Sequence, residues 1–273
     1  MAAPTGKAIY ARNPAWYPEG NPAKYAAQLG CDFIALHHSA SRDEHLRQAA
    51  DVGLPVYLWS HPDSWTPSSW PQTLDAMSER VDQNRLRGFI ADPEYGWQGH
   101  SRRPLADRLA SAAQSLPSVG ITSYPSWYIR DFSQAAAAGL WGSPQLYGII
   151  DPGYLEELRG RADPWRKIFG NDLVPSLAAW VRTPLGNGIT PDGDAAQPPD
   201  QRSYLRGFTQ ERGALLWQTA TSSDLGGRIR PWPGSEGFEI LRQWQPEGAL
   251  PQALVATFMR KVVSPFPWRR RIA

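Results

Sequence analysis

The chain has 273 residues, of which 41% are hydrophobic and 20% charged, a composition typical of a folded protein and not of a disordered one. The formal net charge is +2, so charge alone does not indicate nucleic acid or another broadly charged partner. A single cysteine, Cys31, excludes an internal disulfide and a metal site built from several cysteines.

Targeting signals are not evident in the sequence. The segment 1–7 lacks the apolar core of a signal peptide, and no apolar run is long enough to span a bilayer. We therefore expect no membrane contact, and a protein that is cytoplasmic as made or associated with a virion or similar assembly.

Short apolar runs alternate with helical stretches along the chain. The runs are nearly continuous in apolar residues, as are strands of a parallel sheet covered on both faces. Glycines such as Gly30 and Gly53 mark helix ends. In chain order the predicted strands are 7–13, 31–38, 54–61, 87–94, 119–124, 140–148, 173–180 and 214–219. The predicted helices are 22–29, 43–52, 73–86, 104–116, 129–138, 153–161, 201–210 and 237–244.

Eight strand–helix units in about 240 residues predict an α/β chain folded as a (β/α)8 barrel of the TIM type. A doubly wound open sheet is the alternative, but the sequence has neither of the glycine-rich nucleotide motifs that such sheets often carry. The barrel is expected to occupy 1–245 as a single domain. A long loop covers 181–200, and 246–273 forms a basic C-terminal tail or docking segment.

Polar and aromatic residues concentrate at the carboxyl ends of the predicted strands, where barrel active sites lie. The strand interiors are apolar by comparison, so this asymmetry indicates a functional face. The residues at these ends are Arg12, Asn13, His37, His38, Ser60, His61, Asp92, Glu94, Ser123, Tyr124, Tyr147, Trp180, Trp217 and Gln218.

Two carboxylates leave the fourth strand together. Asp92 and Glu94 are two residues apart, so they point to the same side if the extended geometry continues through Pro93. Paired carboxyls, one protonated and one ionised, are what glycoside hydrolysis requires. Glu94 is the expected general acid because it is longer and lies further out, and Asp92 is its expected ionised partner. The structural alternative is that Asp92 caps a helix and Glu94 forms an ion pair.

The chain contains 13 tryptophans, and several follow strand ends, where flat rings can stack on sugars. For each single tryptophan, core packing is the commoner role. We expect substrate contacts from the following residues: Trp59, Trp97, Trp180, Trp217, Tyr124, His38 and Gln218.

Two other classes of function fit the same residues. A metal-dependent hydrolase would use His38 and His61 with the two acids, although the adjacent His37 and His38 point to opposite sides. A barrel without catalysis would bind carbohydrate or serve as a structural component, with 250–263 docking on a protein partner. No glycine-flanked serine nucleophile is present, and no cofactor or metal is expected.

Three short motifs resemble glycoside hydrolase family 25, the Chalaropsis-type lysozymes. They are Asp92-Pro-Glu94, the segment 120–127 (GITSYPSW) and the segment 216–221 (LWQTAT). The resemblance implies a barrel that cleaves the glycan of peptidoglycan with Glu94 as the acid. That family carries a Gly-x-Asp on its first strand, and its Asp lines the site. Here the first strand reads Ala-Ile-Tyr-Ala-Arg-Asn without an acid, so one site carboxylate is missing unless Asp32 replaces it.

Overall fold

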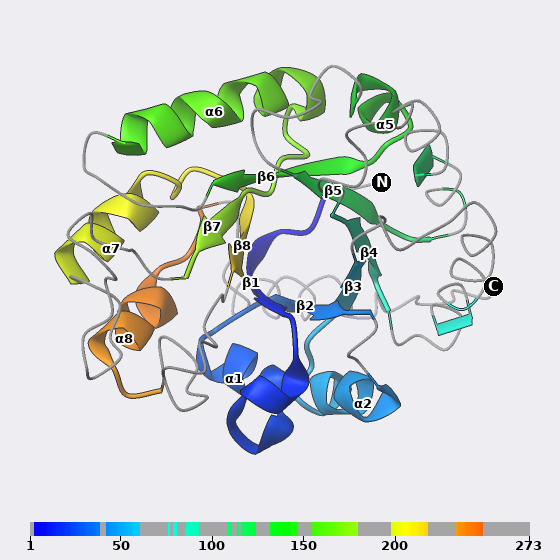
Figure 1. The fold of residues 1–273 in the computed structure, drawn as a ribbon, viewed down its shortest axis with the longest axis vertical. Coiled ribbons are helices and arrows are strands. Elements are labelled where there is room, and N and C mark those ends of the chain that lie inside the picture. The colour runs from blue at the N-terminus through cyan, green and yellow to red at the C-terminus, as the bar shows by residue number, and fades with distance from the viewer. Residues whose placement is uncertain are drawn as a thin grey trace, which may run out of the picture.

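Eight parallel strands, paired in chain order, close into a barrel (Figure 1). The computed structural model describes residues 3–38, 42–60, 76, 79–80, 86–92, 109–110, 114, 116–123, 132–146, 154–179, 198–217 and 233–247. The strands are β1 (Gly6–Ala11), β2 (Phe33–His37), β3 (Val56–Ser60), β4 (Gly88–Ala91), β5 (Val119–Ser123), β6 (Trp141–Leu146), β7 (Ser176–Ala178) and β8 (Gly213–Trp217). The predicted (β/α)8 architecture is confirmed.

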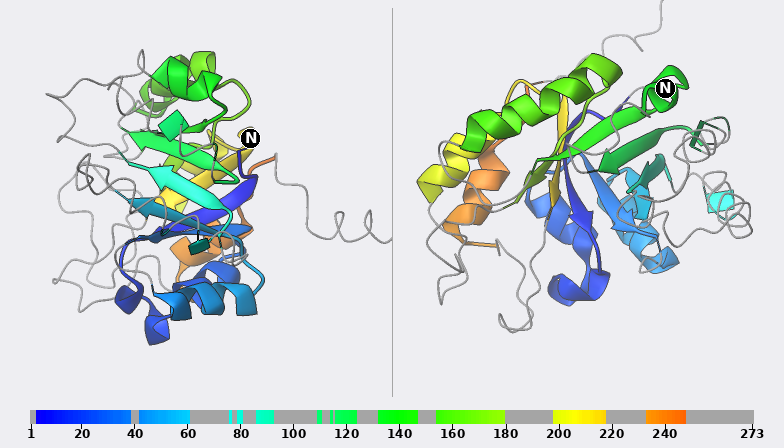
Figure 2. Two further views of the ribbon diagram at one scale, coloured as in Figure 1. Left: turned by 90° about the vertical axis from the view of Figure 1, so that its right-hand side faces the viewer. Right: turned by 45° about the horizontal axis from the view of Figure 1, so that its top comes forward.

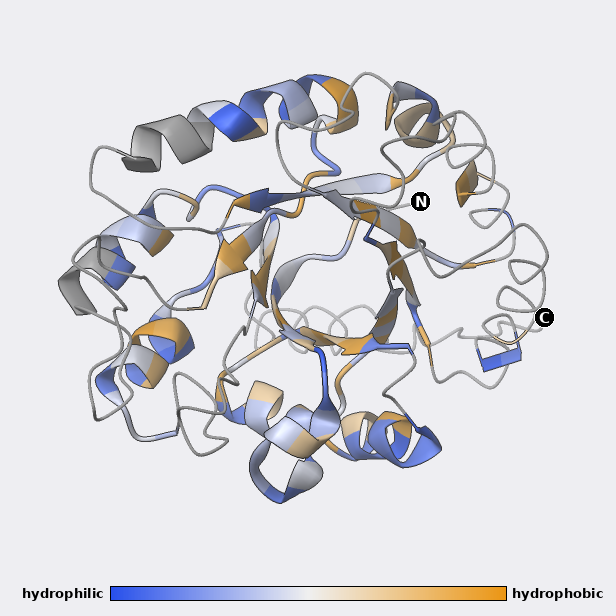
Figure 3. Cartoon of the chain, in the orientation of Figure 1, coloured by the Kyte–Doolittle hydropathy of each residue, from blue (hydrophilic) through white to orange (hydrophobic). Residues whose placement is uncertain are grey.

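Helices lie against the outside of the barrel, as two further views show (Figure 2). Hydrophobic residues concentrate on the strands, while the helices mix both classes (Figure 3). Among the described residues, no helix combines the length and the apolar character needed to cross a membrane. The helices are α1 (Pro22–Gln28), α2 (Asp43–Asp51), α5 (Ser133–Ala137), α6 (Tyr154–Phe169), α7 (Pro198–Arg206) and α8 (Glu236–Gln243), with two 3-10 turns, η1 (Pro14–Trp16) and η2 (Pro18–Gly20).

Most of the predicted helices are present, with shifted ends. The structure has α1, α2 and α8 within one residue of their predicted bounds, and α7 begins inside the predicted 181–200 loop. The predicted helices 73–86 and 104–116 lie mostly outside the described residues. Their few described positions are helical, apart from the last residue of each range, which is not.

Helix α6 is longer than predicted. The sequence predicts its end at residue 161, three residues before Pro164. The helix instead continues to Phe169, with Pro164 inside it. Ala162, Trp165 and Phe169 are buried at helical spacing, and the rings of Trp165 and Phe169 stack with centroids 5.6 Å apart. Burial of this face, at about 1.5–3 kcal/mol for each large side chain, offsets the roughly 3 kcal/mol cost of the proline.

Alternating side chains divide the core into two parts, because successive residues of a strand face opposite sides of the sheet. Ile9 and Ile34 point outward and pack in the layer between strands and helices. Tyr10 and Ala35, one residue further along, belong to a second cluster that fills the barrel lumen. The lumen is therefore a packed core, as in other barrels of this type.

Aromatic rings close the N-terminal end of the lumen. Trp141 lies fully buried across it, and its indole Nε1–H donates to Ser118 Oγ at 3.0 Å. Tyr57 meets Trp141 edge to face with centroids 6.1 Å apart, and Phe33 meets Tyr57 at 5.3 Å. Gly120 pairs with Trp141 on the neighbouring strand, and a Cβ at Gly120 would overlap the indole ring. This close approach requires glycine.

A fully buried lysine joins the first strand to the last helix. Lys7 faces outward from β1, and its ammonium donates to the backbone oxygens of Leu241 at 2.6 Å, Trp244 at 2.9 Å and Arg242 at 3.3 Å. These oxygens lie at the C-terminal end of α8, where the helix dipole favours a cation. Burial lowers the pKa of Lys7 to about 8. Nothing in the sequence indicates this role, because Lys7 stands at the edge of an apolar run like any flanking charge.

The segment after α8 is held against the N-terminal end of the barrel. Gln245 Nε2 donates to Gly30 O at 3.1 Å, and the Glu247 amide donates to Thr209 O at 2.6 Å. Trp244 Nε1 also donates to the Thr209 hydroxyl at 3.3 Å. The tail beyond residue 247 lies outside the described residues, so its docking role and its boundary at 246 stay predictions.

We expect Gly120→Ala to lower the free energy of unfolding by about 1–3 kcal/mol, because the added methyl overpacks the lumen against Trp141. Gly160→Ala is the matched control. Gly160 lies on an exposed turn of α6 with no atom within 4 Å of a Cβ, so alanine should raise stability by up to about 1 kcal/mol. Urea unfolding followed by circular dichroism measures both. Equal effects of the two substitutions would contradict the packing account.

Lys7 should give the protein a characteristic dependence of stability on pH. The folded-state pKa of about 8 lies below the usual value near 10.4, so between these pH values the unfolded state binds more protons. The free energy of unfolding of the wild type, measured relative to Lys7→Met, should therefore rise by up to about 3 kcal/mol as the pH increases from 8 to 10.5. Below pH 8 the difference should stay constant. Urea titrations of both proteins across this range measure it, and a flat difference would refute the assignment.

Candidate functional site

The C-terminal end of the lumen has an aromatic half, formed by four adjacent strands. Tyr10 of β1 meets Trp59 of β3 and Trp217 of β8 edge to face, each with centroids 5.4 Å apart. Trp59 and Trp217 meet at 5.5 Å, and His37 of β2 contacts Trp59 at 4.5 Å. These four rings form one cluster, in which Trp59 is fully buried and Trp217 is partly exposed.

The other four strands give the same level of the lumen a polar half. Ser143 of β6 and Ser176 of β7 share a hydrogen bond of 2.8 Å between their hydroxyls, and Thr122 of β5 lies 3.5 Å from Ser176 Oγ. Gln145, two residues after Ser143, is also buried. Asp92 follows β4 directly. The lumen thus presents apolar rings on one side and hydrogen-bonding groups on the other.

Asp92 is the charged member of the polar half. It is 2% exposed, and its Oδ1 accepts a hydrogen bond of 2.8 Å from Gln145 Nε2 on β6, the next strand but one. The Asp92 amide donates to Ser60 O at 3.0 Å, which continues the ladder between β3 and β4 by one residue. A buried carboxylate needs such donors, because desolvation without them is costly. The structure therefore places Asp92 at the predicted rim, pointing into the barrel; its catalytic role stays a prediction.

Tyr10 connects the two halves. Its ring belongs to the aromatic cluster, and its hydroxyl accepts a hydrogen bond of 3.5 Å from Ser176 Oγ. Burial raises the pKa of Tyr10, and the negative charge of Asp92 raises it further. Tyr10 is therefore a neutral phenol at neutral pH.

The structure brings some of the predicted site residues together. Asp92, Trp59 and Trp217 all line the same end of the lumen. Trp59 is enclosed by other rings, so Trp217 is the more accessible platform of the two. The remaining predicted residues at this rim lie outside the described residues: Glu94, Trp97, Tyr124, Trp180 and Gln218.

The two adjacent histidines have different surroundings. His37 is the one that reaches the aromatic cluster, through Trp59. Burial lowers the pKa of His38, and the nearby charge of Arg80 lowers it further. The His38 amide donates to Trp59 O at 2.8 Å, which fixes the backbone at the end of β2. Substrate binding by His38 stays a prediction, and His37 joins it as a candidate.

Asp32 does not supply the missing first-strand acid. It precedes β2, at the N-terminal end of the barrel, and its Oδ2 accepts a hydrogen bond of 2.9 Å from the Lys7 amide. Burial raises the pKa of Asp32. The correction follows from strand direction. Parallel strands all begin at one end of the barrel, so a residue before β2 lies far from residues that follow β4.

No three His, Cys, Asp or Glu side chains gather as a ligand set among the described residues. His61 and Glu94, which the metal alternative requires, lie outside them, so that alternative is not tested.

Sequence reasoning missed most of the polar half of the lumen. Ser143 and Gln145 alternate with Pro144 and Leu146 on β6, a period of two that marks them as lumen-facing. The irregular composition of the predicted strand 140–148 hid this pattern. Ser176 and Tyr10 sit within apolar runs, where a single hydroxyl gives no signal of its partner.

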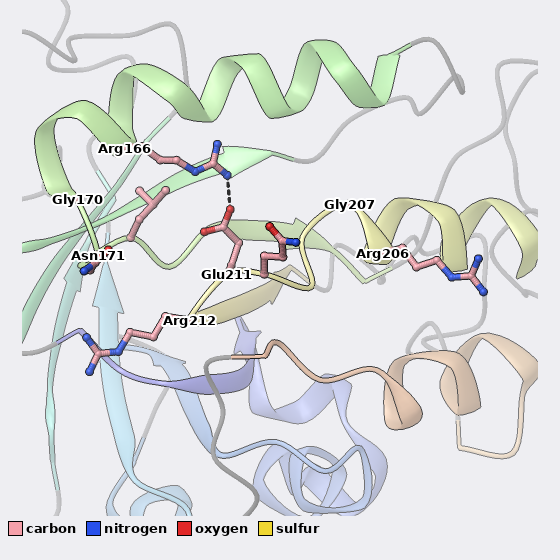
Figure 4. A pocket seen from close by; sticks show the side chains of 9 residues that line it. Arg166, Gly170, Asn171, Arg206, Gly207, Glu211 and Arg212 are labelled. Carbon is pink, nitrogen blue, oxygen red and sulfur yellow. Dashed lines mark hydrogen bonds and ion pairs between the residues drawn. The ribbon is translucent and has the colours of Figure 1, made fainter.

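A hollow of about 700 Å³ lies at the opposite, N-terminal end of the barrel (Figure 4). In it, Arg166 of α6 pairs with Glu211, which precedes β8. Arg206 and Arg212 also line it, but their side chains point away from each other and from Arg166. The arginine side chains therefore do not converge on one point. The hollow is the space where α6, α7 and the start of β8 meet.

No protein-family model matches the chain, and no curated protein sequence matches it. Solved structures do share its fold. An endo-beta-N-acetylglucosaminidase from Cordyceps militaris superposes with a TM-score of 0.54 at 13% identity, covering 87% of this chain and 88% of that one. A family 18 chitinase from Pseudoalteromonas aurantia gives 0.53 at 14% identity, covering 82% and 96%. At these identities the likeness establishes the barrel fold alone.

The amide of Gln145 should be essential to the burial of Asp92. We expect Gln145→Leu to lower the free energy of unfolding by about 1–3 kcal/mol at neutral pH, because the Asp92 carboxylate loses a donor that water cannot replace. The same substitution at the exposed Gln210 should change stability by no more than about 0.5 kcal/mol. Urea unfolding of both variants measures the difference. A stable Gln145→Leu protein would show that other groups suffice to hold Asp92.

Proposed function

We propose that this chain is a glycoside hydrolase that cleaves a polysaccharide containing N-acetylated sugars, with peptidoglycan as the expected substrate. Glu94 serves as the general acid and Asp92 as its ionised partner. The observation that carries the proposal is the Asp92 carboxylate, buried at the end of β4 and held by Gln145 at 2.8 Å, two residues before Glu94.

The sequence spacing between the aspartate and the glutamate supports this proposal. A second structure of the Cordyceps militaris enzyme, which superposes with a TM-score of 0.55 at 13% identity, carries a double substitution and is bound to fucosyl-N-acetylglucosamine-Asn. The two substituted residues are an aspartate and a glutamate two positions apart, each changed to its amide. This chain has the same pair at the same spacing, Asp92 and Glu94.

The proposed reaction divides its roles between the two carboxyls and an aromatic ring. Glu94 would protonate the glycosidic oxygen as the bond to the sugar carbon breaks. The positive charge that develops on the sugar ring is stabilised by the ionised Asp92. A water molecule then adds its hydroxide to the sugar carbon and gives its remaining proton to the Glu94 carboxylate, which restores the acid. The partly exposed ring of Trp217 offers a surface on which a sugar can stack.

A barrel that binds carbohydrate without cleaving it is the second candidate. The observation that favours it is the first strand, where Tyr10 occupies the lumen and no acid is present on β1. Such a protein would retain the aromatic cluster and bind glycans, but would not release products.

Glu94→Gln tests the proposal directly. We expect the release of reducing ends from purified peptidoglycan, or from chitin oligosaccharides, to fall by about 10²–10⁴-fold, because an amide cannot donate the proton. Glu236→Gln is the matched control, since Glu236 is exposed on α8 away from the lumen, and it should retain full activity.

Full activity in Glu94→Gln would remove Glu94 from the mechanism. A wild type that binds these glycans, measured by sedimentation with insoluble substrate, but releases no product would favour the non-catalytic candidate.

A further inference from the structure

The C-terminal end of β6 carries Gln145, the side chain that holds Asp92. Among the described residues, β5 pairs with β6 only as far as Pro144, a residue without an amide N–H. The last two residues of β6 pair instead with β7, on the other side of the strand. The position of Gln145 therefore depends on how the end of β6 is joined to β7.

One phenol of helix α7 bridges the ends of these two strands. Tyr204 Oη donates to Leu146 O of β6 at 2.6 Å and accepts from the Ala178 amide of β7 at 2.9 Å. Tyr204 is 1% exposed, and burial raises the pKa of its phenol, so the hydroxyl stays neutral and can make both bonds. Without this hydroxyl, a buried N–H and a buried carbonyl would each lose a partner, which is costly inside a protein.

Helix α7 holds the same β7 residue a second time. Gln201, one turn before Tyr204, donates from Nε2 to Ala178 O at 3.4 Å. Both polar groups of the Ala178 backbone are thus bonded to side chains of α7. The ring of Tyr204 meets Phe208 edge to face, with centroids 5.4 Å apart. Packing of the ring therefore fixes the place of the hydroxyl.

The amide of Gln145 depends on its backbone for its position. Gln145 is 4% exposed, and Nε2 donates to Asp92 Oδ1 at 2.8 Å. Oε1 is also buried and has no hydrogen-bond partner within the described part of the chain. Since a carboxylate can only accept, the bond to Asp92 determines which amide atom faces it. The amide is then aimed by the β6 backbone, one residue before the oxygen that Tyr204 holds.

We propose that Tyr204 is a positioning residue for Asp92: it fastens β6 to β7 at the place that lets Gln145 reach the carboxylate. Gln201 supports this bridge by holding the same β7 residue. The links are contacts in the structure, since Tyr204 holds the residue that follows Gln145, and Gln145 holds Asp92. The inference rests on the proposed function for its catalytic meaning. Support of this kind, from a group that does not touch substrate, decides how precisely a site is held.

Titration of Asp92 followed by NMR tests this without any substrate. Aspartate labelled with ¹³C at the carboxyl carbon gives one signal per residue, and Asp92→Asn identifies the signal of Asp92. Tyr204→Phe keeps the ring and removes the hydroxyl, so the end of β6 is no longer fastened and Gln145 holds the carboxylate less well. Asp92 should then bind its proton about threefold to tenfold more tightly than in the wild type, because the ionised form loses support.

A double variant shows whether the effect passes through Gln145. Gln145→Leu alone removes the donor and should raise the proton affinity of Asp92 by about tenfold or more. Adding Tyr204→Phe to Gln145→Leu should cause no further change, because the link to Asp92 is already broken. A further shift as large as that in Tyr204→Phe alone would mean that Tyr204 acts by another route, and it would overturn the proposal.

Tyr17→Phe is the matched control. Tyr17 is also buried, and its hydroxyl donates to a strand oxygen, Tyr10 O at 3.3 Å, but it does so from the outer layer against β1. This variant should lose stability, as Tyr204→Phe does, and leave the Asp92 titration unchanged. An unchanged Asp92 titration in folded Tyr204→Phe, or an equal shift in Tyr17→Phe, overturns the proposal.

Gln201→Leu provides a second, milder variant. It removes the donor to Ala178 O and should shift the Asp92 titration in the same direction, by about twofold in proton affinity. If Tyr204→Phe does not fold, an unchanged titration in Gln201→Leu overturns the proposal.

The outcome is separable from that of the Glu94→Gln experiment. If glycan cleavage is found, the acid limb of the pH–rate profile should move to higher pH in Tyr204→Phe and stay in place in Tyr17→Phe. If no glycan is cleaved, the NMR titration still decides whether Tyr204 acts on Asp92.

Discussion

The closure of the barrel is the constraint on which the rest of the structure depends. Once eight strands pair in a ring, every second side chain must fit a lumen of fixed width. At the N-terminal end this space is filled by Trp141, Tyr57 and Phe33, with Gly120 making room for the indole. At the C-terminal end the filling divides into an aromatic half and a polar half. That division, and not any single residue, gives the site its two chemically different walls.

At each end of the barrel, a buried charged side chain is stabilised in a similar way. Lys7 is surrounded by backbone oxygens at the end of α8, and Asp92 accepts a hydrogen bond from Gln145. Each charge is removed from water yet provided with groups of opposite polarity, as burial requires. The two ions differ in their consequences, because Lys7 fastens a helix to the barrel, while Asp92 faces the end of the lumen where barrel chemistry takes place.

The sequence predicted the architecture because it depends on local patterns. Eight apolar runs and the glycines that end helices are each visible within about ten residues. The predicted end of α6 was wrong because the burial of Trp165 and Phe169, which carries the helix past Pro164, is seen only in the folded barrel. Asp92 was found because its neighbours indicate a strand end. Gln145 was missed because its partner is 53 residues away, and only the pairing of β4 with β5 and of β5 with β6 brings the two together.

The three anchors of the segment 244–247 determine how the molecule can be joined to anything else. Lys7, Gly30 and Thr209 fasten it to the end of the barrel that the aromatic rings seal. The chain beyond Glu247 therefore leaves from the N-terminal end of the barrel, on the side opposite the strand ends that carry Asp92 and Trp217. A molecule tethered through its C-terminal side would therefore turn the carboxyl ends of its strands away from the tether.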